Sequence, residues 1–110
     1  MGIVRLDEVV PSLRRVNDEI SAASCFRGAG YEAGLIAFHP RASSDPRFIT
    51  HADKTVLCQV VRGHGRLRTD AADQGLEPGM VCHIPPGTPH DFYADGDQAL
   101  LIFYTLIEVR

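Results

Sequence analysis

The sequence predicts an all-β protein that folds as a sandwich or a barrel. From residue 31 onward, short runs rich in apolar and β-branched residues recur along the chain, and these residue types favour strands. Turn residues, mainly glycine, proline and aspartate, separate the runs at 62–65, 85–87 and 94–97. Several short strands with regularly spaced turns are typical of sandwiches and barrels.

The first part of the chain, residues 1–30, is expected to form an N-terminal arm that is helical over a short stretch or irregular. Four apolar residues follow one another at spacings of three and four, the period of an amphipathic helix; they are Val9, Leu13, Val16 and Ile20. Proline is tolerated only in a first helical turn, so Pro11 places the start of this helix nearby. The barrel is then expected to occupy residues 31–107.

Six runs are predicted as strands because they combine apolar or β-branched residues with turn residues at their ends. They span residues 34–38, 48–51, 55–61, 80–84, 89–93 and 99–107. Leu67 and Thr69 continue a period-two pattern after the turn at 62–65. Residues 70–75 are predicted as another turn.

The last of these strands, residues 99–107, is apolar on both faces. One face packs inside the barrel, so the other needs a cover. We expect a homodimer, since twofold dimers are the commonest soluble oligomers. The alternative is that the N-terminal arm covers this face within one chain.

Composition narrows the class of protein. The chain has 110 residues, which fits a single domain over 1–110. Its formal net charge is -3 with both signs interspersed, which argues against a nucleic-acid-binding protein. No apolar stretch is long enough to span a bilayer, and the start of the chain is charged too early for a secretory signal. We therefore expect a cytoplasmic protein without a membrane partner.

The cysteines do not predict a disulfide framework. There are three, Cys25, Cys58 and Cys82, widely spaced and without a C-x-x-C pair. An odd count at such spacings is also a poor structural zinc site. We expect them to behave mainly as small buried apolar residues.

One stretch narrows the fold further. Gly79, Pro85, Gly87 and His90 read G-x5-P-x-G-x2-H, an order in which a proline ends a strand and a glycine lets the chain reverse. This stretch resembles the second signature motif of the cupin superfamily, with Ala94 in place of the terminal asparagine. The resemblance implies a double-stranded β-helix, also called a cupin or jelly-roll barrel, with the His90 ring inside.

The first cupin motif is degenerate in this sequence. Gly63 fits its closing glycine, and counting back from there His51 takes the position of the second histidine. The positions of the first histidine and of the glutamate hold Ile49 and Val56. The resemblance therefore implies His51 and His90 as metal ligands, two of the four positions of the family.

A catalytic first-row metal usually has three protein ligands and an open position. Asp53 is one candidate for the third, because two imidazoles and a carboxylate suit iron(II). Cys58 is another, because its strand face is expected to point inward and a thiolate favours zinc, iron or copper. The expected cofactor is a divalent transition metal, namely iron, zinc, manganese, nickel or copper. His39, His64 and His83 are weaker candidates.

Two functions remain open. The resemblance implies a metal-dependent enzyme that acts on a small organic molecule, with dioxygenase, isomerase or cyclase-like chemistry. The alternative is a metal-free cupin that binds a small molecule or acts as a regulatory module, which the apolar residues at Ile49 and Val56 favour. A binding module predicts an apolar interior without a complete set of ligands.

Overall fold

The computed structural model describes residues 1–43 and 45–109. A short helix α1 (Leu6–Val9) continues into one 3-10 turn, η1 (Val10–Ser12). Within the described residues, nine strands follow: β1 (Arg14–Arg15), β2 (Ile20–Gly28), β3 (Tyr31–Phe38), β4 (Lys54–Arg62), β5 (Gly65–Arg68), β6 (Asp73–Leu76), β7 (Val81–Ile84), β8 (Asp91–Ala94) and β9 (Leu100–Glu108). The all-β prediction is confirmed.

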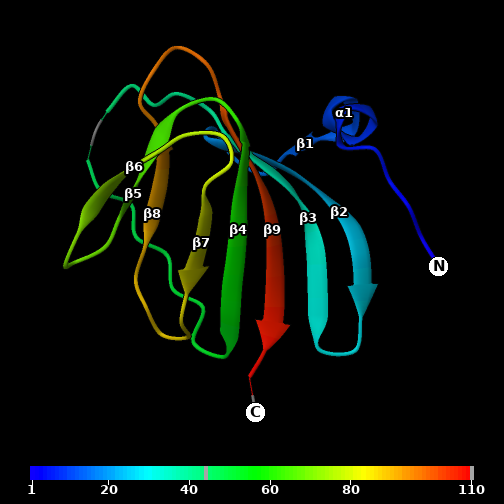
Figure 1. The fold of residues 1–110 in the computed structure, drawn as a ribbon. Helices are drawn as coiled ribbons and strands as arrows, with labels where there is room; N and C mark the ends of the chain where they lie inside the picture. The colour runs from blue at the N-terminus through cyan, green and yellow to red at the C-terminus, as the bar shows by residue number, and fades with distance from the viewer. Residues whose placement is uncertain (44, 110) are drawn as a thin grey trace.

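The strands form two antiparallel sheets. The larger has six strands in the order β1-β2-β3-β9-β4-β7, and the smaller has three in the order β6-β5-β8. In Figure 1, the three strands of the smaller sheet lie together at the left, and α1 lies at the upper right near β1. The last strand of the chain is thus central in the larger sheet, between β3 and β4.

The core lies between the two sheets. Along β4, Val56, Cys58 and Val60 are buried, whereas Leu57 and Gln59 between them are exposed. This alternation follows from the two-residue period of a strand. Val56, Cys58 and Val60 belong to the main core cluster, to which β3, β6, β7, β8 and β9 also contribute buried side chains. Among these are Phe38, Leu76, Ile84, Phe92 and Ile102.

The outer face of the large sheet is only partly covered. A second cluster of Leu35, Ala37 and Leu101 packs against apolar side chains of α1 and the residues after it; these are Leu6, Val9, Val10 and Leu13. Farther across the same face, Leu57, Val81 and Ile107 are 38%, 72% and 39% exposed. The N-terminal segment therefore covers one half of the outer face and leaves the other half in solvent.

The N-terminal arm differs from the prediction. The helix begins at Leu6, and Pro11 lies inside η1. It does not extend to Ile20, because the Asn17 side chain accepts hydrogen bonds from the backbone N–H groups of Glu19 and Ile20 and forms a turn there. Strand β2 follows this turn and pairs along β3, so the sheet begins well before residue 31.

Two smaller elements also differ from the prediction. The expected turn at 70–75 contains the start of β6, which pairs with β5. The expected strand at 48–51 is reduced to a single bridge between Ile49 and His90. The other predicted runs overlap with β3, β4, β7, β8 and β9.

In the described parts of the chain, no helix has the length and apolar character needed to cross a membrane.

Candidate functional site

A cavity of about 190 Å³ lies between the two sheets. Most of the side chains around it are apolar, and they come from β2, β3, β4, β8, β9 and the 49–51 segment. They are Ala22, Ile36, Phe38, Ile49, His51, Val56, Cys58, His90, Phe92, Ile102, Tyr104 and Leu106. The polar groups in this lining are the two histidine rings, the Cys58 thiol and the Tyr104 hydroxyl. The cavity is therefore an apolar space with a few polar atoms at its wall.

Backbone hydrogen bonds place the two histidines beside each other. Ile49 and His90 exchange two bonds of 2.9 Å, each N–H donating to the other residue's carbonyl. The N–H of Gly87 also donates to the carbonyl of His51 at 2.9 Å. Gly87 has φ of +78°, a conformation that favours glycine. The reversal after Pro85 thus brings the 49–51 segment against His90.

The rings of His51 and His90 lie side by side, as predicted from the motif positions. Their centroids are 5.6 Å apart and their planes are inclined by 33°. His90 is 2% exposed, whereas His51 is half-buried. The His90 ring also contacts the Phe92 ring edge-on, with centroids 5.9 Å apart.

The tautomer of His90 follows from its hydrogen bond. Its Nδ1 lies 2.8 Å from the carbonyl oxygen of Thr88, and a carbonyl oxygen can only accept. Nδ1 therefore carries the hydrogen, and in the neutral ring Nε2 is an acceptor. Among residues 1–43 and 45–109, no hydrogen-bond partner is found for this Nε2. The ring presents an unpaired acceptor at the cavity.

The surroundings of His51 favour its neutral form. Burial lowers the pKa of His51, and the neighbouring His90 and Lys54 lower it further, whereas Asp53 acts in the opposite direction. The causes are ordinary ones, since burial and nearby positive charge both disfavour an imidazolium. A neutral imidazole can accept a hydrogen bond or a proton from a bound molecule.

The residues present do not complete a three-ligand metal centre. No group of three or more histidine, cysteine, aspartate or glutamate side chains placed to hold a metal ion occurs in the described part of the chain. Asp53 is exposed in the turn before β4, where its carbonyl accepts a hydrogen bond from Val109. The metal-ligating side chains at the cavity are thus two imidazoles and the Cys58 thiol, without a carboxylate.

Cys58 does line the cavity with the two histidines, as its strand face predicted. It lies directly opposite Cys82 of β7 and Tyr104 of β9. Burial, followed by the charge of Cys82, raises the pKa of the Cys58 thiol to about 12. The thiol is therefore protonated at neutral pH and acts as an apolar wall group.

The weaker histidine candidates lie elsewhere. His39 shares a hydrogen bond of 2.8 Å between its Nε2 and the Ser21 hydroxyl. His64 is exposed after Gly63, and His83 is exposed on the outer face of β7. None of the three contributes to the cavity.

A buried charge cluster directly beside the site was not predicted. Asp91, 2% exposed, forms ion pairs with Arg41 and with Arg68, the latter at 2.9 Å. Arg41 also pairs with Glu19 at 3.1 Å and donates to the carbonyl of Phe92 at 3.1 Å. The cluster ties the loop after β3 to β8. The only signal for it in the sequence is an aspartate inside a predicted strand.

The comparisons with known proteins agree with this architecture. A family model described as "Cupin domain" matches residues 34–106. The chain is a cupin. The second motif of the cupin has the geometry its residues predict, since Gly79 and Gly87 both have positive φ, +94° and +78°. No curated protein matches the sequence.

Solved structures similar to this cupin include three of comparable size. A predicted oxalate decarboxylase from Thermotoga maritima has a TM-score of 0.80 at 16% identity, covering 98% of this chain and 100% of that one. The protein TT1209 from Thermus thermophilus has a TM-score of 0.78 at 19% identity, covering 100% of both chains. A protein from Klebsiella pneumoniae with a double-stranded β-helix domain has a TM-score of 0.77 at 16% identity, covering 98% and 90%.

These likenesses show the fold of the cupin, because all three identities are below 20%. The predicted double-stranded β-helix is confirmed. One fold can carry many different functions, so the function of this cupin depends on the residues that line its cavity.

Proposed function

We propose that this cupin binds a small organic molecule in the cavity between the sheets, and that the part of the molecule inside the cavity is one apolar ring with a hydrogen-bond donor. One observation carries the proposal. Two histidine rings, 5.6 Å apart, lie at the wall of an otherwise apolar cavity of about 190 Å³. Pockets of this kind, apolar with a few placed polar groups, are typical small-molecule sites.

The size of the cavity limits the ligand. An engineered apolar cavity of about 150 Å³ in another protein accommodates benzene. A cavity of about 190 Å³ therefore has space for one six-membered ring and a small substituent. Phenol is a suitable probe.

The polar groups of the cavity wall determine which substituent the ring of the ligand should carry. His90 Nε2 is an acceptor without a partner among the described residues. A ligand with a hydroxyl group can donate to it, whereas a hydrocarbon of the same shape leaves it unpaired. Because an unpaired buried polar group is unfavourable, the difference favours the donor. The neutral His51 supplies a second polar contact at the half-buried side of the cavity.

The test compares phenol with toluene by isothermal titration calorimetry. We expect phenol to bind about tenfold more tightly, the ratio that one added hydrogen bond of about 1.4 kcal/mol gives. Ala22→Ile fills the cavity and should abolish binding of both. Ala23→Ile, the matched control, places the same side chain on the opposite face of β2 and should bind as the wild type does. Absence of phenol binding to a folded wild-type protein would contradict the proposal.

A metal-dependent activity is tested in the same preparations. Elemental analysis of tag-free protein, before and after incubation with each candidate ion, measures bound metal. The incomplete donor set leads us to expect substoichiometric metal, since three protein ligands are the usual minimum. Stoichiometric metal that is lost in both His51→Ala and His90→Ala would replace our proposal by a metal-dependent one.

We also propose that the cupin forms a homodimer through the uncovered half of the outer sheet face. Leu57, Val81 and Ile107 come from the adjacent strands β4, β7 and β9 and point to the same side. Light scattering after size exclusion should give the mass of two chains, and Val81→Lys should give one. A wild-type protein with the mass of one chain would contradict this.

A further inference from the structure

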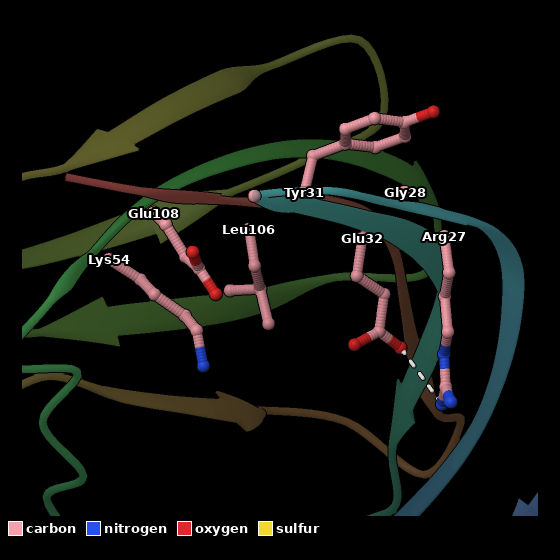
Figure 2. Close-up of a pocket in the computed structure, with 8 residues that line it drawn as sticks. Arg27, Gly28, Tyr31, Glu32, Lys54, Leu106 and Glu108 are labelled. Atoms are coloured by element: carbon pink, nitrogen blue, oxygen red, sulfur yellow. Dashed lines mark hydrogen bonds and ion pairs between the residues drawn. The ribbon is translucent and has the colours of Figure 1, made fainter. Parts of the chain in front are cut away.

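A second hollow, of about 320 Å³, lies along the inner face of the large sheet. Its wall includes four charged side chains and one leucine: Arg27, Glu32, Lys54, Leu106 and Glu108. Figure 2 shows these five side chains extending from the same side of the sheet, whereas Tyr31 extends from the other side. We call this hollow the charged rim.

The charged rim adjoins the apolar cavity. Leu106 lines both, and it lies opposite Glu32 on one neighbouring strand and Val56 on the other. Lys54 and Glu108 lie opposite each other one step farther along the same face. Two residues of a strand span roughly 7 Å. The backbone positions of Lys54 and Glu108 therefore lie about that far from Val56 and Leu106, which line the cavity.

The backbone of the charged rim is held in place. The N–H of Glu108 donates to the carbonyl of Gly30 at 2.8 Å, and the N–H of Val109 donates to the carbonyl of Asp53 at 2.9 Å. The end of β9 is thus bonded on both sides, to the β2–β3 turn and to the residue before β4. A ligand that reached the rim would meet groups on ordered strands.

The four charges of the rim fall into two pairs that differ. Arg27 and Glu32 form an ion pair of 3.5 Å, and the Tyr104 hydroxyl donates to the same glutamate at 3.1 Å. Lys54 and Glu108 face each other across β4 and β9, but within the described residues their side chains form no ion pair or hydrogen bond. They present one free cation and one free anion in this part of the chain.

Resting on the proposed function, we infer that the natural ligand is zwitterionic, with its ring in the apolar cavity and its charged head group at Lys54 and Glu108. A carboxylate on the ligand would contact the Lys54 ammonium, and an ammonium would contact the Glu108 carboxylate. Charge-assisted hydrogen bonds of this kind are stronger than neutral ones. An α-amino acid with a hydroxylated aromatic side chain combines the ring, the donor for His90 and both charges. Free tyrosine is the probe.

The experiment compares four ligands that share one phenol ring. L-Tyrosine carries both charges, tyramine only the ammonium, 3-(4-hydroxyphenyl)propionate only the carboxylate, and 4-methylphenol neither. We expect tyrosine to bind about tenfold more tightly than 4-methylphenol, the gain expected from two exposed charge contacts together. Each singly charged analogue should gain less, because it leaves one rim charge facing a ligand without its counterpart.

Variants of the charged rim separate this inference from the proposed function. Lys54→Gln and Glu108→Gln should each reduce the preference for tyrosine severalfold and leave 4-methylphenol binding unchanged. Glu8→Gln, an exposed charge removed from α1 outside the barrel, is the matched control and should change neither. The exchanged pair Lys54→Glu with Glu108→Lys keeps one charge of each sign and should keep part of the preference.

The outcomes are distinguishable. If 4-methylphenol binds and tyrosine binds no more tightly, the inference is wrong and the proposed function stands. If tyramine or the propionate binds as tightly as tyrosine, the head group is singly charged and the inference is also wrong. If none of the four ligands binds to folded protein, the proposed function fails with it.

Discussion

His90 and Asp91 are consecutive residues, and both are 2% exposed. Their buried polar side chains differ in how fully other groups of the chain pair with them. The Asp91 carboxylate receives two arginines, Arg41 and Arg68, so its charge is compensated on the spot. The His90 ring satisfies Nδ1 on the Thr88 carbonyl and leaves Nε2 at an apolar cavity. The charged group of Asp91 is thus paired within the chain, whereas His90 keeps one ring nitrogen without a partner among the described residues.

The difference shows how to separate structural from functional polar residues in this barrel. A buried charge whose partners are all within the chain contributes to the fold, and its removal leaves those partners uncompensated. An acceptor that lines a cavity and has no partner within the described residues, such as His90 Nε2, is available to a bound molecule instead. Four experiments test this separation, from the largest expected effect to the smallest.

Asp91→Asn should destabilise the fold most strongly. It removes an anionic partner that Arg41 and Arg68 share, and breaking a buried pair in this way typically costs about 3–5 kcal/mol. Urea denaturation followed by circular dichroism measures the free energy of unfolding. A loss below about 1 kcal/mol, the range of exposed pairs, would show that the cluster is not structural.

His90→Leu should affect binding far more than stability. It removes one hydrogen bond, to a half-buried residue, so we expect a loss of about 1 kcal/mol in the free energy of unfolding. The preference for phenol over toluene should disappear, because the acceptor is gone. Calorimetry and urea denaturation of the same sample measure both quantities. A variant that keeps the phenol preference would place the acceptor elsewhere in the cavity.

Acid should lower the stability of the folded protein. Burial lowers the pKa of both His51 and His39, with nearby positive charges as further causes. In the unfolded chain these rings take up protons near pH 6.5, but in the folded protein only at lower pH. The stability present above pH 6.5 is therefore lost as pH falls through the folded pKa values. Thermal unfolding between pH 8 and 5, with His51→Gln and His39→Gln as comparisons, should show a smaller loss in each variant.

The exposed pair of Arg66 and Asp73 supplies the smallest effect. These two side chains are 38% and 49% exposed and 2.6 Å apart, and such surface pairs contribute little to stability because solvent screens them. Asp73→Asn should therefore change the free energy of unfolding only slightly, and added salt should make this change smaller still. An effect as large as that of Asp91→Asn would mean that burial does not explain the difference between the two aspartates.

Much of the fold was predictable because local patterns and the final packing agree. Strand β4 combines β-branched residues with strict alternation, and the glycines of the second motif have the conformation their turns require. Strand β2 was missed because its sequence consists largely of small residues, and the helical spacing of the apolar residues before it favoured a helix. Its pairing with β3 is a tertiary contact that periodicity does not reveal.

The site was predictable in part for the same reason. His51 and His90 could be located because motif spacing counts positions along strands, and their rings do lie together. Asp53 was selected for its chemistry, but chemistry does not say where a turn side chain points, and it is exposed. Arg41 lies 50 residues from Asp91, in the loop after β3, so no local sequence pattern indicates that they pair. Its side chain is 7% exposed.

Strands β4 and β9 serve two surfaces at once. Val56, Cys58 and Leu106 line the cavity, while Leu57 and Ile107, their immediate neighbours in the chain, lie on the uncovered outer face. The ligand and the neighbouring subunit that we propose would thus be separated by a single layer of polypeptide. Any shift of these two backbones on one side necessarily moves side chains on the other, so occupancy of the barrel and self-association are expected to influence each other in both directions.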